Sequence, residues 1–274
     1  MTKITTTKKA STPIWRWLLC ALVILGFSTT NLKAQVTVTN PSNTAPGLSA
    51  SYGTLAAAIT DLNLQTAISG QVVITLTGNE TAPSGGYQIT AIPAGASATN
   101  NIVIQGSSST ITAFGGQASG SLNDAIFKLI GADFITLQNF TMQENVANAT
   151  TAAATNNMTE WGVALLYAST TNGAQNNIIQ NNTISLNRTS LNTFGIYSNT
   201  RHSATAVTTT AEVTSAAGSN SGNKVYGNSI SNVNYGIVFI GAGTTLAAID
   251  NGNDIGGTSL STGNTITNWG GEHL

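Results

Sequence analysis

Three copies of a short motif, an asparagine followed by a hydroxyl residue and an isoleucine, constrain the fold of this chain more than any other feature. The copies are Asn182-Thr183-Ile184, Asn228-Ser229-Ile230 and Asn264-Thr265-Ile266, and Phe140-Thr141-Met142 is a looser one. A short β-rich stretch precedes the motif, and an aromatic residue, a glycine and another such stretch follow it. This order predicts a repeating unit of strand, tight turn, strand, loop and strand, as in a solenoid.

The spacing of the repeat is irregular, but the extra residues gather at one link of each unit. From Met142 the central apolar positions follow at steps of 42, 46 and 36 residues. The long links are 168–176, 199–222 and 241–263, and all are rich in Ala, Thr, Ser, Asn and Gly. Insertions at one corner leave stacked strands undisturbed, so we expect a single elongated parallel solenoid.

Apolar residues alternate within the expected strands, as at Ile135 and Leu137, so one side of each strand faces inward. We therefore expect Ile184, Ile230 and Ile266 to lie above one another in the interior. The asparagines mark the neighbouring turn, where their side chains accept left-handed backbone geometry and bond to nearby backbone. Stacked copies can also bond to each other as a ladder.

A short amphipathic helix is expected before the first strands. Leu55, Ala58, Ile59 and Leu62 recur at spacings of three and four, and Thr54 is the expected N-cap. Expected strands follow at Val72–Leu76, Tyr87–Ile89, Ile102–Gln105 and Ile126–Ile130. The fold class is therefore all-β, a parallel β-helix with a helix that covers its first coil, as terminal caps do in repeat proteins. We assign residues 35–65 to the N-terminal segment and this helix, and 66–274 to the β-helix.

Residues 1–34 have the order of a secretory signal peptide. Basic residues precede an apolar run from Trp17 to Phe27, and a small residue, Ala34, marks the expected cleavage site. The run is about half the ~20 apolar residues that a membrane span needs. We therefore expect a secreted or cell-surface protein with no membrane span in the mature chain. Cys20 is removed with the peptide, so the mature chain has no disulfide.

Charge is scarce and limits the possible partners. Charged residues make up 7% of the chain, and after Ala34 four basic residues stand against ten acidic ones, a formal charge of −6. Nucleic acid is therefore not an expected partner. Acidic polysaccharides are poor substrates for such a chain, because their cleavage by a lyase needs cations to neutralise the carboxylate and a base to remove a proton.

The repeat resembles a known family. The run Asn177 to Ile184 followed by Phe194 to Tyr197, repeated at Val225 to Val238, resembles the right-handed parallel β-helix of pectin-lyase-like proteins. The helix over Leu55–Leu62 is similar to the N-terminal cap of that superfamily, and the resemblance covers roughly residues 50–270. It implies the fold but no activity, because neither the Asp clusters with a catalytic Arg of pectate lyases nor the short catalytic strings of polygalacturonases occur here.

The junction Leu32–Gln35 and the Ala/Thr/Asn-rich insertions resemble large surface proteins that Gram-negative bacteria export through type IX secretion. Such proteins carry a C-terminal sorting domain, which does not occur before Leu274. We therefore expect the chain to be a fragment whose last coil is uncapped.

Four groups of residues are candidates for a functional site. Asp250, Asn251, Asn253 and Asp254 place oxygen ligands at alternate positions that could hold Ca²⁺, and the favoured alternative is a turn without a ligand. No other cofactor is expected. Arg201-His202 is either a glycan contact or a solvated loop pair, and Glu272-His273 resembles an acid/base pair without a visible third partner. Trp161, Tyr235 and Trp269 each precede a glycine, and they form either corner packing or a sugar-binding ladder.

Two functions from different classes remain open. The first is a non-catalytic, adhesin-like structural or binding module for polysaccharides or cell-surface glycans. It is favoured by the repeat, the expected export, the low charge and the missing catalytic strings. The alternative is a polysaccharide lyase or glycoside hydrolase whose catalytic residues lie outside this chain.

Overall fold

The structure is a computed structural model that describes Thr2 and residues 35–90, 93–119, 123–152, 155–204 and 213–270. The chain divides into two units between Lys33 and Ala34, and Ala34–Leu274 is the second. Apart from Thr2, the expected signal peptide at 1–34 lies outside the described residues. The hydrophobic core of the described residues begins at Val36, so the second unit carries its own core. Across the described ranges, no helix is long and apolar enough to cross a membrane.

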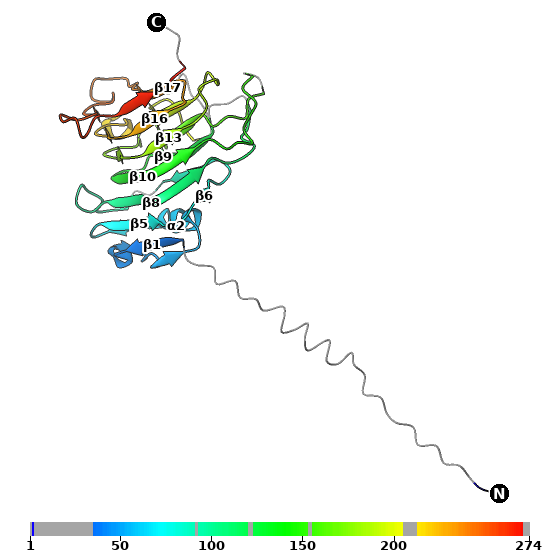
Figure 1. Cartoon of the computed structure of the whole chain (residues 1–274). Coiled ribbons are helices and arrows are strands. Elements are labelled where there is room, and N and C mark those ends of the chain that lie inside the picture. Colours follow the sequence, from blue (N-terminus) through cyan, green and yellow to red (C-terminus); the bar gives the residue numbers. More distant parts are fainter. Residues whose placement is uncertain are drawn as a thin grey trace. The chain divides into compact units, whose positions relative to one another are not determined.

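Two mainly parallel sheets make up most of the second unit (Figure 1). The long sheet contains β1 (Val36–Thr39), β3 (Ser51–Tyr52), β5 (Val72–Leu76), β6 (Glu80–Thr81), β8 (Ile102–Thr112), β10 (Ile135–Gln143), β12 (Ile178–Gln180), β13 (Thr183–Ser185), β15 (Lys224–Tyr226), β16 (Ser229–Ser231), β18 (Asp254–Ile255) and β19 (Thr265–Thr267). The second sheet has the order β17 (Tyr235–Ile240), β14 (Phe194–Asn199), β11 (Trp161–Leu166), β9 (Ala125–Ile130) and β7 (Tyr87–Ile89). The short β2 (Thr44–Ala45) and β4 (Ala67–Ile68) pair separately, and single 3₁₀ turns, η1 and η2, lie at Pro41–Asn43 and Ala216–Gly218.

The register predicted from the motif is confirmed. Met142 pairs with Ile184, Ile184 with Ile230 and Ile230 with Ile266, all between parallel strands. The side chains of Met142, Ile184 and Ile230 are fully buried in one core. The all-β class is therefore confirmed, with strands that return to the same register after each long link.

The predicted asparagine ladder is also present. Asn182 donates its backbone N–H to Oδ1 of Asn228 at 3.1 Å, and Asn228 donates in the same way to Asn264 at 3.0 Å. A second ladder runs through Asn177 and Asn223, where the backbone N–H of Asn177 donates to Oδ1 of Asn223 at 3.0 Å. Each buried amide thus satisfies backbone groups that a turn leaves without a strand partner, which removes a cost of about 1–3 kcal/mol for each such group.

The glycine after each aromatic residue has a packing reason. A Cβ atom on Gly162 would lie 2.6 Å from Cγ2 of Ile184, and one on Gly195 would lie 2.4 Å from Cγ2 of Ile230. Such distances are shorter than real Cβ contacts. The second sheet can therefore approach the isoleucine column only where its strands carry glycine.

The predicted helix is α2 (Leu55–Leu62), and Oγ1 of Thr54 caps it by accepting the N–H of Ala57 at 3.1 Å. The carboxylate of Glu80 accepts the N–H of Leu55 at 2.9 and 3.1 Å. The sequence pattern did not predict β1, which pairs antiparallel with both β5 and β3. The expected strands before and after Asn139 form a single strand, β10, with an irregular pairing between Gln138 and Phe140.

Candidate functional site

The expected calcium ligands lie at the end of the asparagine ladders. Oδ1 of Asp250 accepts the N–H of Asn220 at 2.9 Å, and Oδ1 of Asn253 accepts the N–H of Asn223 at 2.8 Å. Oδ2 of Asp254 accepts the hydroxyl of Tyr226 at 2.6 Å. These three side chains thus engage three different residues of the preceding coil.

The neighbouring Asn251 donates its backbone N–H to Oγ of Ser221 at 2.9 Å. Burial raises the pKa of Asp250 to about 6. Within the described part of the chain, no three His, Cys, Asp or Glu side chains converge as a metal site. The contacts of residues 250–254 fit a stacked turn, the favoured alternative for this segment.

The pair Arg201-His202 differs from both expectations, because His202 is fully buried. Its ring packs edge-on against Trp161, with 4.8 Å between the centroids and an interplanar angle of 78°. Its Nδ1 lies 3.3 Å from the hydroxyl of Tyr197. His202 therefore belongs to an aromatic cluster. The other expected pair, Glu272-His273, lies outside the described residues.

The aromatic residues before glycine form a column on the second sheet, but Trp269 is not in it. Trp161 pairs in register with Phe194, and Phe194 with Tyr235. The rings of Phe194 and Tyr235 stack at 5.0 Å, whereas Trp161 stacks on Tyr197 at 5.1 Å. Trp269 is 56% exposed and lines a hollow of about 390 Å³ at the end of the stack.

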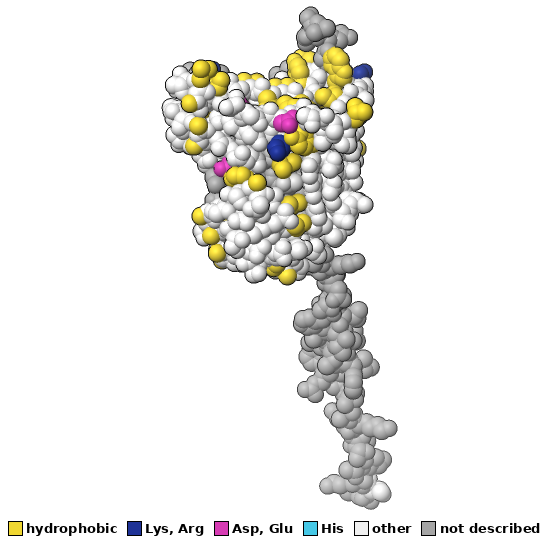
Figure 2. All heavy atoms as spheres, turned by 90° about the vertical axis from the view of Figure 1, so that its left-hand side faces the viewer, with side chains coloured by type: hydrophobic (Ala, Val, Ile, Leu, Met, Phe, Trp, Pro, Cys, Tyr) yellow, Lys and Arg dark blue, Asp and Glu magenta, His cyan; other side chains and the backbone are white. Residues whose placement is uncertain are grey.

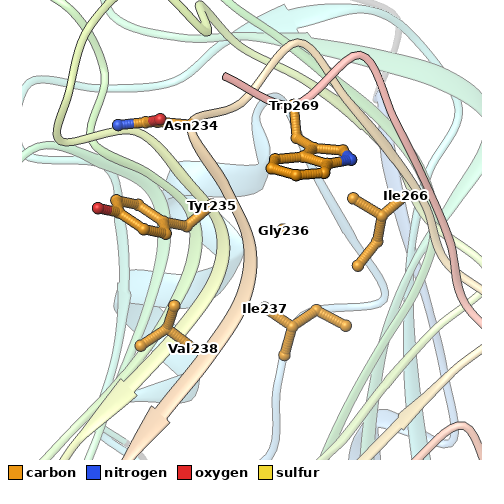
Figure 3. A pocket seen from close by; sticks show the side chains of 7 residues that line it. All are labelled: Asn234, Tyr235, Gly236, Ile237, Val238, Ile266 and Trp269. Atoms are coloured by element: carbon orange, nitrogen blue, oxygen red, sulfur yellow. The ribbon is translucent and has the colours of Figure 1, made fainter. Parts of the chain in front are cut away.

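Figure 3 shows the side chains around that hollow. The indole of Trp269 lies on one side of Gly236, and Tyr235 lies on the other. Ile237 and Ile266 complete the apolar lining. The expected ladder of Trp161, Tyr235 and Trp269 is thus corrected at its last member, because β17 is the last described strand of the second sheet and leaves Trp269 no strand of that sheet on which to pair.

A cluster of three buried charged residues, Asp124, Lys128 and Glu160, with the partly exposed Glu144 beside them, escaped the sequence analysis. Asp124, Lys128 and Glu160 are each at most 5% exposed. Oε2 of Glu160 accepts the backbone N–H groups of Asn123 and Asp124 at 3.0 and 2.6 Å, and Oε2 of Glu144 accepts that of Thr159 at 2.9 Å. The carboxylates therefore fasten the residues that lead into β9 and β11.

Burial shifts the titration of this cluster. Desolvation raises the pKa of Glu160 to about 8 and that of Asp124 to about 6, and it lowers the pKa of Lys128. Shifted acids and bases of this kind also occur in active sites. Asp124, Lys128 and Glu160 are buried, so a polysaccharide cannot reach these three side chains in the arrangement described. The signal in the sequence is Lys128 inside the otherwise apolar run Ala125–Ile130.

Three glutamines, Gln105, Gln138 and Gln180, form a row along the long sheet. We call these three residues and their neighbours Gln71, Asn101 and Thr136 the amide face. Gln105, Gln138 and Gln180 are in register on β8, β10 and β12. Gln138 donates to Gln105 at 2.8 Å, and Gln180 donates to Gln138 at 2.6 Å. Because each primary amide has two N–H donors and two acceptor lone pairs, one ladder bond leaves capacity for a ligand.

Two hollows lie along the amide face. The larger, of about 380 Å³, is lined by Gln71, Val73, Asn101, Val103, Gln105, Thr136, Gln138, Ile178 and Gln180. The smaller, of about 140 Å³, shares Asn101, Thr136 and Ile178 with it and adds Lys224. The larger hollow thus has amide, hydroxyl and aliphatic walls without a charged side chain. Figure 2, which views one face of the molecule, likewise shows mostly uncharged polar surface.

Sequence reasoning missed the amide face because its glutamines are not part of the asparagine motif. A glutamine at the end of the strand before each of two turns, Gln138 and Gln180, was the available signal. Comparisons with protein-family models, with curated proteins and with solved structures find no match to this chain.

Proposed function

We propose that this chain is an exported, non-catalytic binding module that holds a neutral polysaccharide along the amide face. The observation that carries the proposal is the larger hollow, whose walls combine five side-chain amides and the hydroxyl of Thr136 with Val73, Val103 and Ile178. Sugar hydroxyls both donate and accept hydrogen bonds, as primary amides do. The aliphatic side chains suit the C–H faces of sugar rings.

The proposal includes the fold, a right-handed parallel β-helix of the pectin-lyase-like kind with α2 as its N-terminal cap. The parallel registers, the two asparagine ladders and the glycines beneath the isoleucine column support it. In such a fold each coil rises ~4.8 Å, so a chain of sugars lying across the coils meets a glutamine amide on each of three successive coils, at Gln105, Gln138 and Gln180.

The uncharged lining favours a neutral over an acidic polysaccharide. Recognition of uronate carboxylates relies on Arg, Lys or bound cations. Lys224, at the smaller hollow, is the one charged residue that lines the two hollows. An acidic polymer therefore meets little charge to offset its desolvation.

A retention experiment tests the proposal. Residues 35–274 are passed over insoluble neutral polysaccharides and over polygalacturonate and alginate. We expect retention on at least one neutral polymer and none on the acidic ones. The double variant Gln105→Ala/Gln138→Ala should weaken retention at least about tenfold, which corresponds to 1.4 kcal/mol.

The matched control is Gln88→Ala, since Gln88 is an exposed glutamine on β7 of the second sheet. Equal losses from both variants, or retention on acidic polymers alone, would contradict the proposal. Release of sugar ends by residues 35–274 that disappears with Lys224→Ala would contradict the non-catalytic part of the proposal.

A further inference from the structure

The strands that carry the isoleucine column have a second, outward-facing side. In β13 and β16 the central isoleucine is buried, so the residue before it and the residue after it point away from the core. The position before the column holds Thr110, Thr141, Thr183, Ser229 and Thr265, and the position after it holds Thr112, Gln143, Ser185, Ser231 and Thr267. We call these ten residues the hydroxyl array, and the two positions its first and second columns.

The hydroxyl array repeats regularly in two directions. It runs over β8, β10, β13, β16 and β19, which pair in parallel with each array residue opposite its equivalent on the next strand. Neighbouring strands of a sheet lie ~4.8 Å apart, and alternate residues of one strand lie roughly 6.6 Å apart. The array is therefore a two-dimensional lattice of side chains.

Hydroxyl groups fill the whole first column, and they are available to solvent. Thr141, Thr183, Ser229 and Thr265 are exposed, and Thr110 is half-buried. Within the described residues, no hydrogen bond engages any of these five hydroxyls. A hydroxyl donates one hydrogen bond and accepts two, so the first column has its full capacity free.

The second column is partly engaged by the protein. Oγ1 of Thr112 accepts Nε2 of Gln143 at 3.1 Å, and Oγ of Ser185 accepts Nδ2 of Asn232 at 2.8 Å. These bonds fix the positions of two hydroxyls and leave each of them able to bond further. The second column therefore extends the lattice that the first column begins.

The backbone beneath the array is held from both sides. The ladder from Asn182 through Asn228 fixes the turn before the first column, and Ile184 and Ile230 fix the buried side of the strands. Threonine adds stiffness of its own, because its branched Cβ restricts χ1. The lattice is thus formed in advance, which lowers the entropy cost of binding to a rigid surface.

The array itself contains neither a charged nor an aromatic residue. Two of the charged residues that border it, Glu80 and Glu144, are engaged by backbone N–H groups. A third, Arg188, donates to Asn268 at 2.8 Å beside the last strand, and residues 271–274 lie outside the described ranges. The ten residues therefore offer a ligand no ion pair and no aromatic platform for a sugar ring.

We propose that the hydroxyl array is an ice-binding surface. Hydroxyls on neighbouring strands hold water molecules in rows whose spacing is close to a repeat of the oxygen lattice of ice, and the methyl groups of the threonines fill the gaps between those rows. A crystal surface repeats in two directions, as the array does. Asn181 and Asn182 separate the array from Gln180 of the amide face, so the proposal does not rest on glycan binding.

The growth of single ice crystals in solutions of residues 35–274 tests the proposal. We expect faceted crystals and a freezing point that lies below the melting point. Thr183→Lys should abolish this gap, because the lysine side chain rises above the lattice and keeps its own hydration shell. The matched control is Thr37→Lys, which changes an exposed threonine of β1 outside the array and should leave the gap unchanged.

A gain of activity gives a second test. Ser229 and Ser231 lack the methyl groups that threonine has, so Ser229→Thr/Ser231→Thr should widen the gap. Far-ultraviolet circular dichroism of each variant shows that the fold is intact. A decrease in the gap with this double variant in its folded state would contradict the role given to the methyl groups and overturn the proposal.

Rounded ice crystals without a gap at high protein concentration would also overturn it, as would equal losses from Thr183→Lys and Thr37→Lys. If the unchanged chain does not shape ice and Thr183→Lys abolishes retention on a neutral polysaccharide, the array is a glycan surface and the proposal is wrong. Gln105→Ala/Gln138→Ala should leave the ice activity intact, which separates this surface from the amide face.

Discussion

The outward sides of the two sheets use polar side chains in opposite ways. On the long sheet, Gln105, Gln138 and Gln180 are partly exposed and bond to each other, and they line an open hollow. On the second sheet, Lys128 and Glu160 are buried beneath covering segments together with Trp161. These buried charges thus fasten the structure, whereas neutral amides line the larger hollow of the long sheet.

If the amide face binds as proposed, a perturbed pKa does not by itself locate a functional site. The carboxyl groups with the largest shifts are covered and engaged by backbone N–H groups, as at Glu160. The accessible amides do not titrate. Variants on the two faces should therefore separate stability from binding.

The largest effect is expected from Trp161→Ala on the covered face. The indole is fully buried and stacks on Tyr197, so its removal should lower the free energy of unfolding by about 3–5 kcal/mol. Urea denaturation of residues 35–274 measures the loss. A loss below about 1 kcal/mol would mean that the covering segments do not bury this face in solution.

The next effect is the pH dependence of stability. Burial raises the pKa of Asp124 to about 6 and that of Glu160 to about 8, above their values in the unfolded chain. The folded state therefore holds more protons, and stability should be highest below about pH 4 and be lost as the pH rises through about 6 and 8. The lowered pKa of Lys128 has the opposite effect on stability. Between that lowered pKa and the usual alkaline pKa of lysine, its contribution makes stability rise with pH.

Urea midpoints measured from mildly acidic to mildly alkaline pH check this dependence. Glu160→Gln keeps an acceptor for the two backbone N–H groups and removes the charge, so the decline through about pH 8 should flatten. Gln138→Ala should leave the decline unchanged. A stability that rises with pH over this range would refute the burial of Glu160.

A smaller effect is expected from Gln138→Ala on the amide face. One ladder bond on each side is lost in a partly exposed setting, so the free energy of unfolding should fall by about 0.5–1.5 kcal/mol. Urea denaturation of Gln138→Ala and of Trp161→Ala under the same conditions compares the two losses. A loss as large as that of Trp161→Ala would show that the amide face is structural.

The smallest effect is expected from calcium. Asp250, Asn253 and Asp254 are engaged by the preceding coil, so addition of Ca²⁺ or of a chelator should leave the thermal midpoint unchanged. Differential scanning calorimetry is the measurement. A clear rise with Ca²⁺ that Asp254→Asn removes would reveal a calcium site at this turn.

Much of the parallel stack could be predicted from one motif. The register of Ile184, Ile230 and Ile266 follows from their common place after the turn asparagines, because side chains that repeat with the coil must stack in the core. The helix over Leu55–Leu62 followed from its apolar spacing and its N-cap. Both are local patterns whose physical reason lies within a few residues.

Features that depend on distant partners could not be predicted. Glu160 is 36 residues from Asp124, whose N–H it accepts, and nothing in the local sequence marks the pair. His202 lies in a long insertion, yet it packs against Trp161. The amide face is likewise a product of register, since its glutamines become neighbours only when β8, β10 and β12 pair.

The most direct test of the central claim, that the uncharged face is the binding face, is a titration with neutral oligosaccharides followed by NMR. We expect the side-chain NH₂ resonances of Gln105, Gln138 and Gln180 to shift together, while that of Gln88 and the indole resonance of Trp161 stay in place. Shifts confined to the second sheet would contradict the account, as would binding that leaves all three glutamines unchanged.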